Sequence, residues 1–178
     1  MLFRSMVADN SKCPVIMYNV PSRTGMSISL NAISVLSKHP NIWGIKEASG
    51  NISYSIKVSE YLSNDFHMLS GNDDIITPMM SIGACGVISV LANCCPNQVA
   101  KICSLCENNN YKEALDLQLK LLSFTNDLFI EVNPIPVKEA MNYLGFNVGG
   151  YRLPLDYMSS NNKKILYDEI DRIKELIK

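Results

Sequence analysis

The stretch GIKEASG, residues 44–50, decides the fold of this chain. It closes a short apolar run typical of a buried strand, and the residues after it change to helical spacing. Outward from it in both directions, short β-branched runs alternate with amphipathic stretches, which is typical of βα units in a parallel sheet. We therefore predict an α/β fold with four consecutive units, whose strands lie at residues 14–20, 41–48, 66–70 and 86–91.

Beyond residue 108 the strands stop and the remaining sequence has helical spacing alone. Ser29 is a plausible N-cap, and Asp73 and Asp74 suit the first turn of a helix. A further helix opens at Pro96, and the others are expected at residues 30–38, 52–62, 111–129, 134–144 and 165–177. The predicted organisation is a remnant helix at residues 1–10, four βα units at 11–108 and a helical region at 109–178.

Charge and hydropathy argue against several classes of partner. The 178 residues carry a formal net charge of −1 with a pI near 6.1, so we expect no nucleic acid partner and no attraction to anionic lipid. Residues 75–100 are uncharged over more than the roughly 20 residues that span a bilayer. Proline and glycine residues break this run into shorter elements, so we expect no membrane span.

Cysteine usage favours reduced thiols and a cytoplasmic location, because the six cysteines lie in apolar surroundings without a recognisable secretory leader. Cys103 and Cys106 form a CxxC pair on a predicted helix. The pair has neither a second CxxC nor a nearby histidine, so we expect ordinary helix packing and no metal site.

The carboxyl ends of parallel strands face one rim, where loops hold ligands. Four candidate site residues fall at or near these ends: Tyr18, Lys46, Gly71 and Ile88. Burial would lower the pKa of Lys46 and make its amine a nucleophile able to form a Schiff base with a carbonyl substrate. A strand lysine can also extend to solvent or pair with a neighbour such as Glu47.

Two further side chains suit this chemistry. Tyr18 is a weak acid that could pass protons, or else a core tyrosine with a satisfied hydroxyl. Arg23, in the loop after the first strand, offers the planar fork that binds carboxylates, or else is a solvated loop charge.

Together the motifs YNVPSRTG (18–25), GIKEASG (44–50), LSGND (69–73), GVISV (86–90) and NPIPVKEAM (133–141) resemble the pyruvate-dependent class I aldolases, and most closely their dihydrodipicolinate synthase branch. The resemblance implies strands five to eight of a TIM (β/α)₈ barrel with a C-terminal helical extension. It implies that Lys46 forms the Schiff base with pyruvate, with no other cofactor, and that Tyr18 relays protons. Arg23 would bind the carboxylate of aspartate semialdehyde, and Gly71 and Ile88 would line the pyruvate pocket. The implied pathway is lysine and diaminopimelate biosynthesis. N-acetylneuraminate lyases are similar around the tyrosine and lysine but lack the arginine, so the synthase branch is favoured.

The sequence departs from this family in lacking its first four βα units. With them go the threonine-rich segment that binds the pyruvate carboxylate and the tyrosine that a neighbouring subunit lends. We therefore expect a truncated lyase with weak or no turnover alone, which associates, as a homo-oligomer, through its open edges, inner faces or helical tail. The alternative is a non-catalytic assembly or regulatory subunit, or a relic fragment. A doubly wound nucleotide binder is disfavoured because no GxGxxG or P-loop motif is present.

Overall fold

The computed structural model describes residues 2–177, with side chains from residue 5 onward. The chain divides into two compact units, Met1–Ile88 and Ser89–Lys178, which we call the sheet unit and the helical unit. The predicted division into residues 1–10, 11–108 and 109–178 refers to barrel units and stays a prediction.

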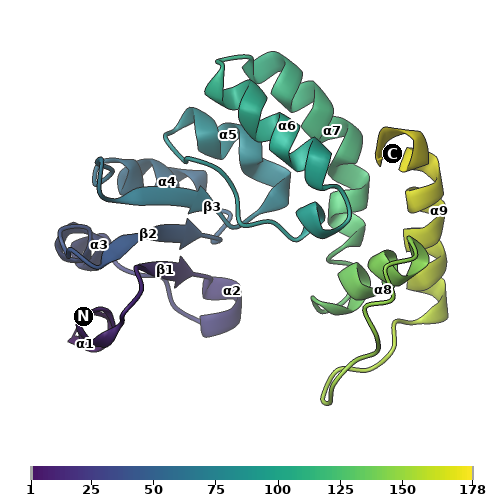
Figure 1. The fold of residues 1–178 in the computed structure, drawn as a ribbon, viewed down its shortest axis with the longest axis horizontal. Coiled ribbons are helices and arrows are strands. Elements are labelled where there is room, and N and C mark those ends of the chain that lie inside the picture. Colours follow the sequence, from purple (N-terminus) through teal and green to yellow (C-terminus); the bar gives the residue numbers. More distant parts are fainter. Residues whose placement is uncertain (1, 178) are drawn as a thin grey trace. The chain divides into compact units, whose positions relative to one another are not determined.

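The sheet unit contains a three-stranded parallel sheet in the order β1-β2-β3 (Figure 1). Its strands are β1 (Val15–Asn19), β2 (Ile42–Glu47) and β3 (His67–Ser70). They confirm the first three predicted strands. Its helices are α1 (Leu2–Asn10), α2 (Pro21–Thr24), α3 (Leu30–Leu36), α4 (Ile52–Ser59), η1 (Asp73–Ile75) and α5 (Ile76–Ser81). Met1, the first residue of the predicted terminal helix, lies outside the described residues.

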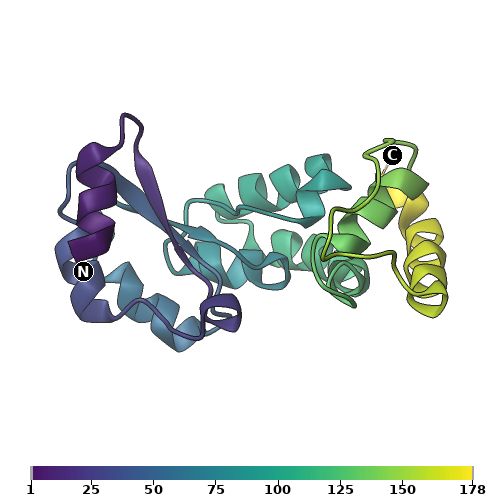
Figure 2. The ribbon, with the colours of Figure 1, turned by 90° about the horizontal axis from the view of Figure 1, so that it is seen from below.

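Register across the sheet separates two faces, because successive side chains of a strand point to opposite sides. One row, Met17, Ile45 and Met68, is buried on the face that α3 and α4 cover (Figure 2). The next row, Tyr18, Lys46 and Leu69, lies on the opposite face and is partly exposed. The core of the unit therefore lies between the sheet and these helices, and includes Ile33, Leu36, Val58 and Phe66.

Helix α3 starts as predicted, because the Ser29 side chain accepts a hydrogen bond from the Ala32 amide at 3.2 Å. Helix α4 starts in the same way, with Asn51 accepting from the Tyr54 amide at 3.0 Å. A side-chain cap thus fixes the first residue of both helices.

The fourth predicted strand, residues 86–91, is wrong as a full strand. Only one isolated bridge forms, between Ser70 and Val87, with hydrogen bonds from the Ser70 amide to Gly86 O (2.8 Å) and from the Ile88 amide to Ser70 O (2.9 Å). Strand β3 ends at Ser70 and so offers no further partner. By Val90 the backbone is already helical, ahead of η2 (Leu91–Asn93).

In the described part of the helical unit, η2 is followed by four helices: α6 (Pro96–Glu107), α7 (Tyr111–Asp127), α8 (Ile135–Tyr143) and α9 (Ser160–Ile177). Helices α6 and α7 pack together, and α9 packs on α7 and α8 (Figure 1). The core side chains include Ile102, Leu121, Phe124, Ala140, Leu166 and Ile170. Helix α9 begins at Ser160, five residues before the predicted start at 165. The prediction missed this first turn because its residues are polar and carry no apolar periodicity.

Candidate active site

Lys46 lies on the partly exposed face of β2, one residue before the end of the strand. Burial is the main influence on its amine and lowers the pKa from its ordinary value, while the negative charge of Asp73 acts in the opposite direction. Burial disfavours a charged ammonium group. The Lys46 amine is therefore neutral, and so nucleophilic, more readily than the amine of an exposed lysine.

Tyr18 is directly opposite Lys46 in the register of β1 and β2. The Lys46 Nζ lies 4.5 Å from the centre of the Tyr18 ring, within the range of a cation–π contact. The tyrosine is 51% exposed in the sheet unit, so it is not part of the core between the sheet and its helices.

Gly71 packs directly against the stem of Lys46. A Cβ atom built on Gly71 would lie 2.5 Å from Ala48 Cβ, 3.1 Å from Glu47 O and 3.1 Å from Lys46 Cε. The Gly71 amide donates to Glu47 O at 2.7 Å, which fixes this close approach. A residue with any side chain here would displace the lysine stem or the neighbouring backbone.

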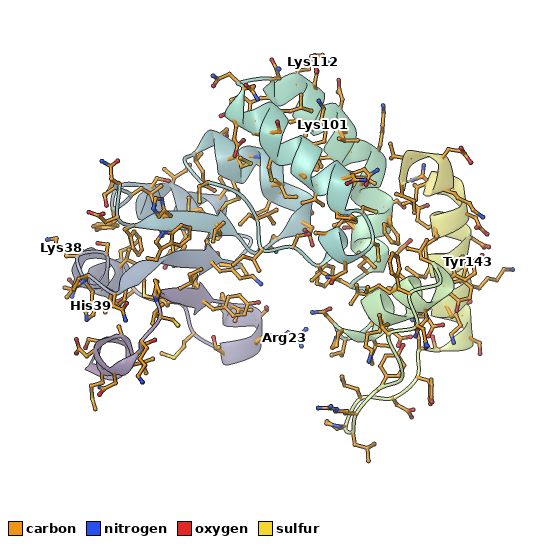
Figure 3. All side chains as sticks on the ribbon, in the orientation of Figure 1. Arg23, Lys38, His39, Lys101, Lys112 and Tyr143 are labelled. Carbon is orange, nitrogen blue, oxygen red and sulfur yellow. The ribbon has the colours of Figure 1, made fainter. Side chains whose placement is uncertain are left out.

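Arg23 and Ile88 lie on the segments that follow the outer strands of the sheet unit. Arg23 is exposed in α2, a single turn closed by Gly25 in a left-handed conformation, and Figure 3 shows its side chain extending outward from that helix. Ile88 is 39% exposed just beyond the bridge to Ser70. The structure thus places Tyr18 and Gly71 beside Lys46. Arg23 lies on the segment after β1, and Ile88 lies directly after the bridge to β3.

The buried face of the sheet ends in a polar row that sequence reasoning missed. Asn19, Glu47 and Ser70 are aligned across the three strands, and each is at most 1% exposed. Glu47 accepts hydrogen bonds from Asn19 Nδ2 at 2.6 Å and from the Ser49 amide at 2.7 Å. Glu47 therefore lies on the face opposite to Lys46, and the expected alternative of a Lys46–Glu47 pair is wrong.

Asp73 is the second acidic residue whose role the sequence did not reveal. We expected it to favour the start of a helix, and it does open η1. It is also buried, at 3% exposed, and its charge acts on the Lys46 amine. A signal was present in the sequence, because acidic residues directly after a strand lie at the rim where ligands bind.

Two hollows lie away from these residues. One of about 720 Å³ is in the sheet unit, where Lys38 and His39 (labelled in Figure 3) and Trp43 contribute to its wall. The other, of about 440 Å³, is in the helical unit beside Asn142 and Tyr157. Within residues 2–177 no cluster of three or more metal-ligating side chains occurs, and none of the helices there is long and apolar enough to cross a bilayer.

Comparison with known proteins decides the family. The sequence model of the dihydrodipicolinate synthetase family matches residues 2–173. The chain belongs to this family. The match includes all five candidate residues.

Individual members of the dihydrodipicolinate synthetase family are closely similar. The 4-hydroxy-tetrahydrodipicolinate synthase of Caldicellulosiruptor saccharolyticus is 52% identical over 160 residues, which are 90% of this chain and 54% of that protein. The enzyme of the same name from Brachyspira hyodysenteriae is 46% identical over 170 residues, 96% of this chain and 58% of that protein. The solved structure of the 4-hydroxy-tetrahydrodipicolinate synthase of Methylacidiphilum fumariolicum SolV superposes with a TM-score of 0.92 at 37% identity, covering 98% of this chain and 59% of that one. The chain thus spans just over half the length of the relatives it matches.

Proposed function

We propose that this chain carries the Schiff-base chemistry of a 4-hydroxy-tetrahydrodipicolinate synthase, a lyase that joins pyruvate to aspartate semialdehyde in lysine and diaminopimelate biosynthesis. The observation that carries the proposal is the Lys46 amine, whose pKa burial lowers and which faces the ring of Tyr18 at 4.5 Å. Membership of the dihydrodipicolinate synthetase family and the names of the relatives support it.

Lys46 is the nucleophile in the proposed mechanism. Its neutral amine adds to the keto carbon of pyruvate, and the carbinolamine loses water to give an iminium ion. Loss of a methyl proton from the iminium gives an enamine, which attacks the aldehyde carbon of the second substrate. The amino group brought by aspartate semialdehyde then adds to the new iminium carbon, and departure of the Lys46 amine from that carbon closes the ring of the product and restores the amine.

The other four residues serve this sequence of steps. Tyr18 passes protons to and from the carbinolamine, a role that its partly exposed position beside the Lys46 amine suits. Arg23 binds the carboxylate of aspartate semialdehyde. Gly71 and Ile88 line the pyruvate pocket, where the missing side chain of Gly71 leaves room for the lysine stem.

We propose that β1, β2, β3 and the bridge segment at Val87 are strands five to eight of a TIM (β/α)₈ barrel, and that residues from 109 onward form the helical extension. The parallel order of the three strands and the partly exposed row of Tyr18, Lys46 and Leu69 support this assignment. In a closed barrel that row would face the interior.

A polypeptide of these 178 residues should turn over weakly or not at all by itself. The resemblance implies that family members hold a threonine-rich segment and a partner tyrosine outside the region represented here, and general acid–base assistance is typically worth about 10² to 10⁴ in rate. Within the described residues β1 pairs with β2 alone, and its outer edge should also promote association into homo-oligomers. The cytoplasmic location stays a prediction.

The test is a condensation assay with pyruvate and aspartate semialdehyde, combined with light scattering at micromolar concentration. We expect little or no product and a species larger than the monomer. Turnover on the order of 1 to 10³ s⁻¹ would contradict the expected dependence on further residues. A monodisperse monomer would contradict the proposed association. Cleavage of N-acetylneuraminate in place of the condensation would move the assignment to the lyase branch.

A further inference from the structure

We propose that Asn19 and Glu47 are positioning residues, whose buried pair holds the loop of residues 20–28 in a fixed place relative to the strand that carries Lys46. We call this segment the Arg23 loop. The proposal deepens the proposed function and rests on it where it assigns Arg23 and Lys46 to the same site. The pair itself touches neither proposed substrate.

Burial and register make the pair more than an ordinary surface contact. Asn19 and Glu47 are both 1% exposed and lie directly opposite each other in β1 and β2. Each is the immediate neighbour of a proposed catalytic residue, Tyr18 in β1 and Lys46 in β2. A buried carboxylate is costly unless it is hydrogen-bonded, so a side chain with this cost implies a role beyond filling space.

The Arg23 loop is fastened at both of its ends by Asn19. It leaves the sheet directly after Asn19, and its last residue returns to donate a hydrogen bond from the Ile28 amide to Asn19 Oδ1 at 2.9 Å. The hydroxyl of Tyr54 fixes the same residue by donating to Ile28 O at 2.5 Å. The stem of the loop is thus closed, and Arg23 lies within it.

The direction of each hydrogen bond defines the chemistry that the pair needs. Asn19 uses its carbonyl oxygen for the Ile28 amide and therefore presents its NH₂ group to Glu47. Glu47 receives two donors, Asn19 Nδ2 on Oε2 and the Ser49 amide on Oε1. Both Glu47 oxygens accept, so the arrangement needs two acceptor oxygens at this position, which an amide side chain does not have.

This requirement gives a sharp test in the full chain. In Glu47→Gln one oxygen becomes an NH₂ group, so one hydrogen bond is lost whichever way the amides turn. The double variant Asn19→Asp with Glu47→Gln restores them all. Its introduced glutamine would donate to the introduced aspartate and accept from the Ser49 amide, while the aspartate would still accept from the Ile28 amide. The swap also keeps one negative charge in the pair.

The readout is hydrogen exchange of the Ile28 amide together with the rate of tryptic cleavage after Arg23, both under native conditions. We expect Glu47→Gln to accelerate both about tenfold, the effect on local opening of losing one hydrogen bond to a charged group. The double variant should return to within about twofold of the parent. Phe66→Leu, a core change away from the pair, controls for lost global stability and should leave both rates near those of the parent.

Two results overturn the proposal: unchanged loop opening in Glu47→Gln, or failure of the double variant to recover. If Glu47→Gln does not fold, the double variant decides alone, because the proposal requires it to fold with a parent-like loop. Trapping of pyruvate on Lys46, measured in parallel, keeps the two hypotheses apart. A parent chain that traps no pyruvate contradicts the proposed function, whereas the loop measurements still decide the role of the pair.

Discussion

Replacing Gly71 by alanine tests the close packing behind Lys46. The new Cβ would meet Ala48 Cβ at 2.5 Å, a distance that forces a shift, and would meet Glu47 O and Lys46 Cε at 3.1 Å each. Gly71 does not have a positive φ, so the whole cost is steric. Overpacking of this kind costs typically about 1–3 kcal/mol.

Trp43, the single tryptophan of the chain, lies in β2 and so reports on the sheet unit by fluorescence. With a urea m-value of about 2 kcal/mol/M, the loss of about 1–3 kcal/mol lowers the unfolding midpoint by roughly 0.5–1.5 M. The rate of pyruvate trapping should fall as well, because Lys46 Cε, at 3.1 Å, is one of the atoms that the new Cβ would crowd.

Two glycine variants control for the change in residue type. A Cβ on Gly150 would meet only Tyr157 Oη at 3.9 Å, so Gly150→Ala should be near neutral. Gly50→Ala meets nothing within 4 Å but has φ +71°, so it should cost only the conformational strain, about 1–2 kcal/mol, without impairing trapping. If Gly71→Ala unfolds at the parent midpoint and traps pyruvate at the parent rate, the packing argument is wrong.

Three other predictions follow from particular contacts. Asp73→Asn removes a negative charge that raises the pKa of Lys46, and the neutral amine is the nucleophile, so the rise in trapping rate with pH should move to lower pH. The control Asp74→Asn, at an exposed neighbour, should move it less, and a shift to higher pH in Asp73→Asn would contradict the electrostatics. Ser29→Ala removes the cap of α3 and should destabilise the sheet unit by about 1 kcal/mol in urea unfolding followed by Trp43 fluorescence. Ser27→Ala, at an exposed position, should have no effect, and equal unfolding midpoints for the two variants would argue against the cap. Burial raises the pKa of Cys94 and Cys95 to about 12. A disulfide-exchange reagent at about pH 8 should therefore modify the exposed Cys13 and Cys85 first and reach the buried pair only on unfolding, and prompt modification of the pair in folded protein would contradict its burial.

Periodicity in the sequence was sufficient for most of the secondary structure. The strand patterns around Val15, Ile42 and His67 and the apolar stripes of α6, α7 and α8 are local signals, and the structure has elements at those places. The fourth strand failed for a non-local reason. An apolar run such as residues 86–91 becomes a strand only where a neighbour continues beside it, and β3 stops at Ser70.

The candidate site was predictable where one residue type carries the chemistry. Lysine in an apolar strand is a local anomaly, and the tyrosine opposite it follows once the strands are aligned in parallel. The hydrogen bonds of Asn19 were not predictable, because they join it to Glu47, 28 positions away, and to the Ile28 amide, 9 positions away. Taken one at a time, these are ordinary strand-end and loop residues. The influence of Asp73 on Lys46 likewise depends on how β2 and the turn after β3 approach in space.

The residue to which pyruvate attaches decides whether Lys46 is the Schiff-base lysine. The chain is incubated with pyruvate and borohydride, its intact mass is measured, and the modified peptide is mapped; Lys46→Ala and the exposed-lysine control Lys57→Ala are treated in parallel. We expect one reduced pyruvyl adduct on Lys46, present in the parent and in Lys57→Ala and absent from Lys46→Ala. No adduct on folded protein, or an adduct that persists in Lys46→Ala, would contradict the assignment of Lys46 as the Schiff-base lysine.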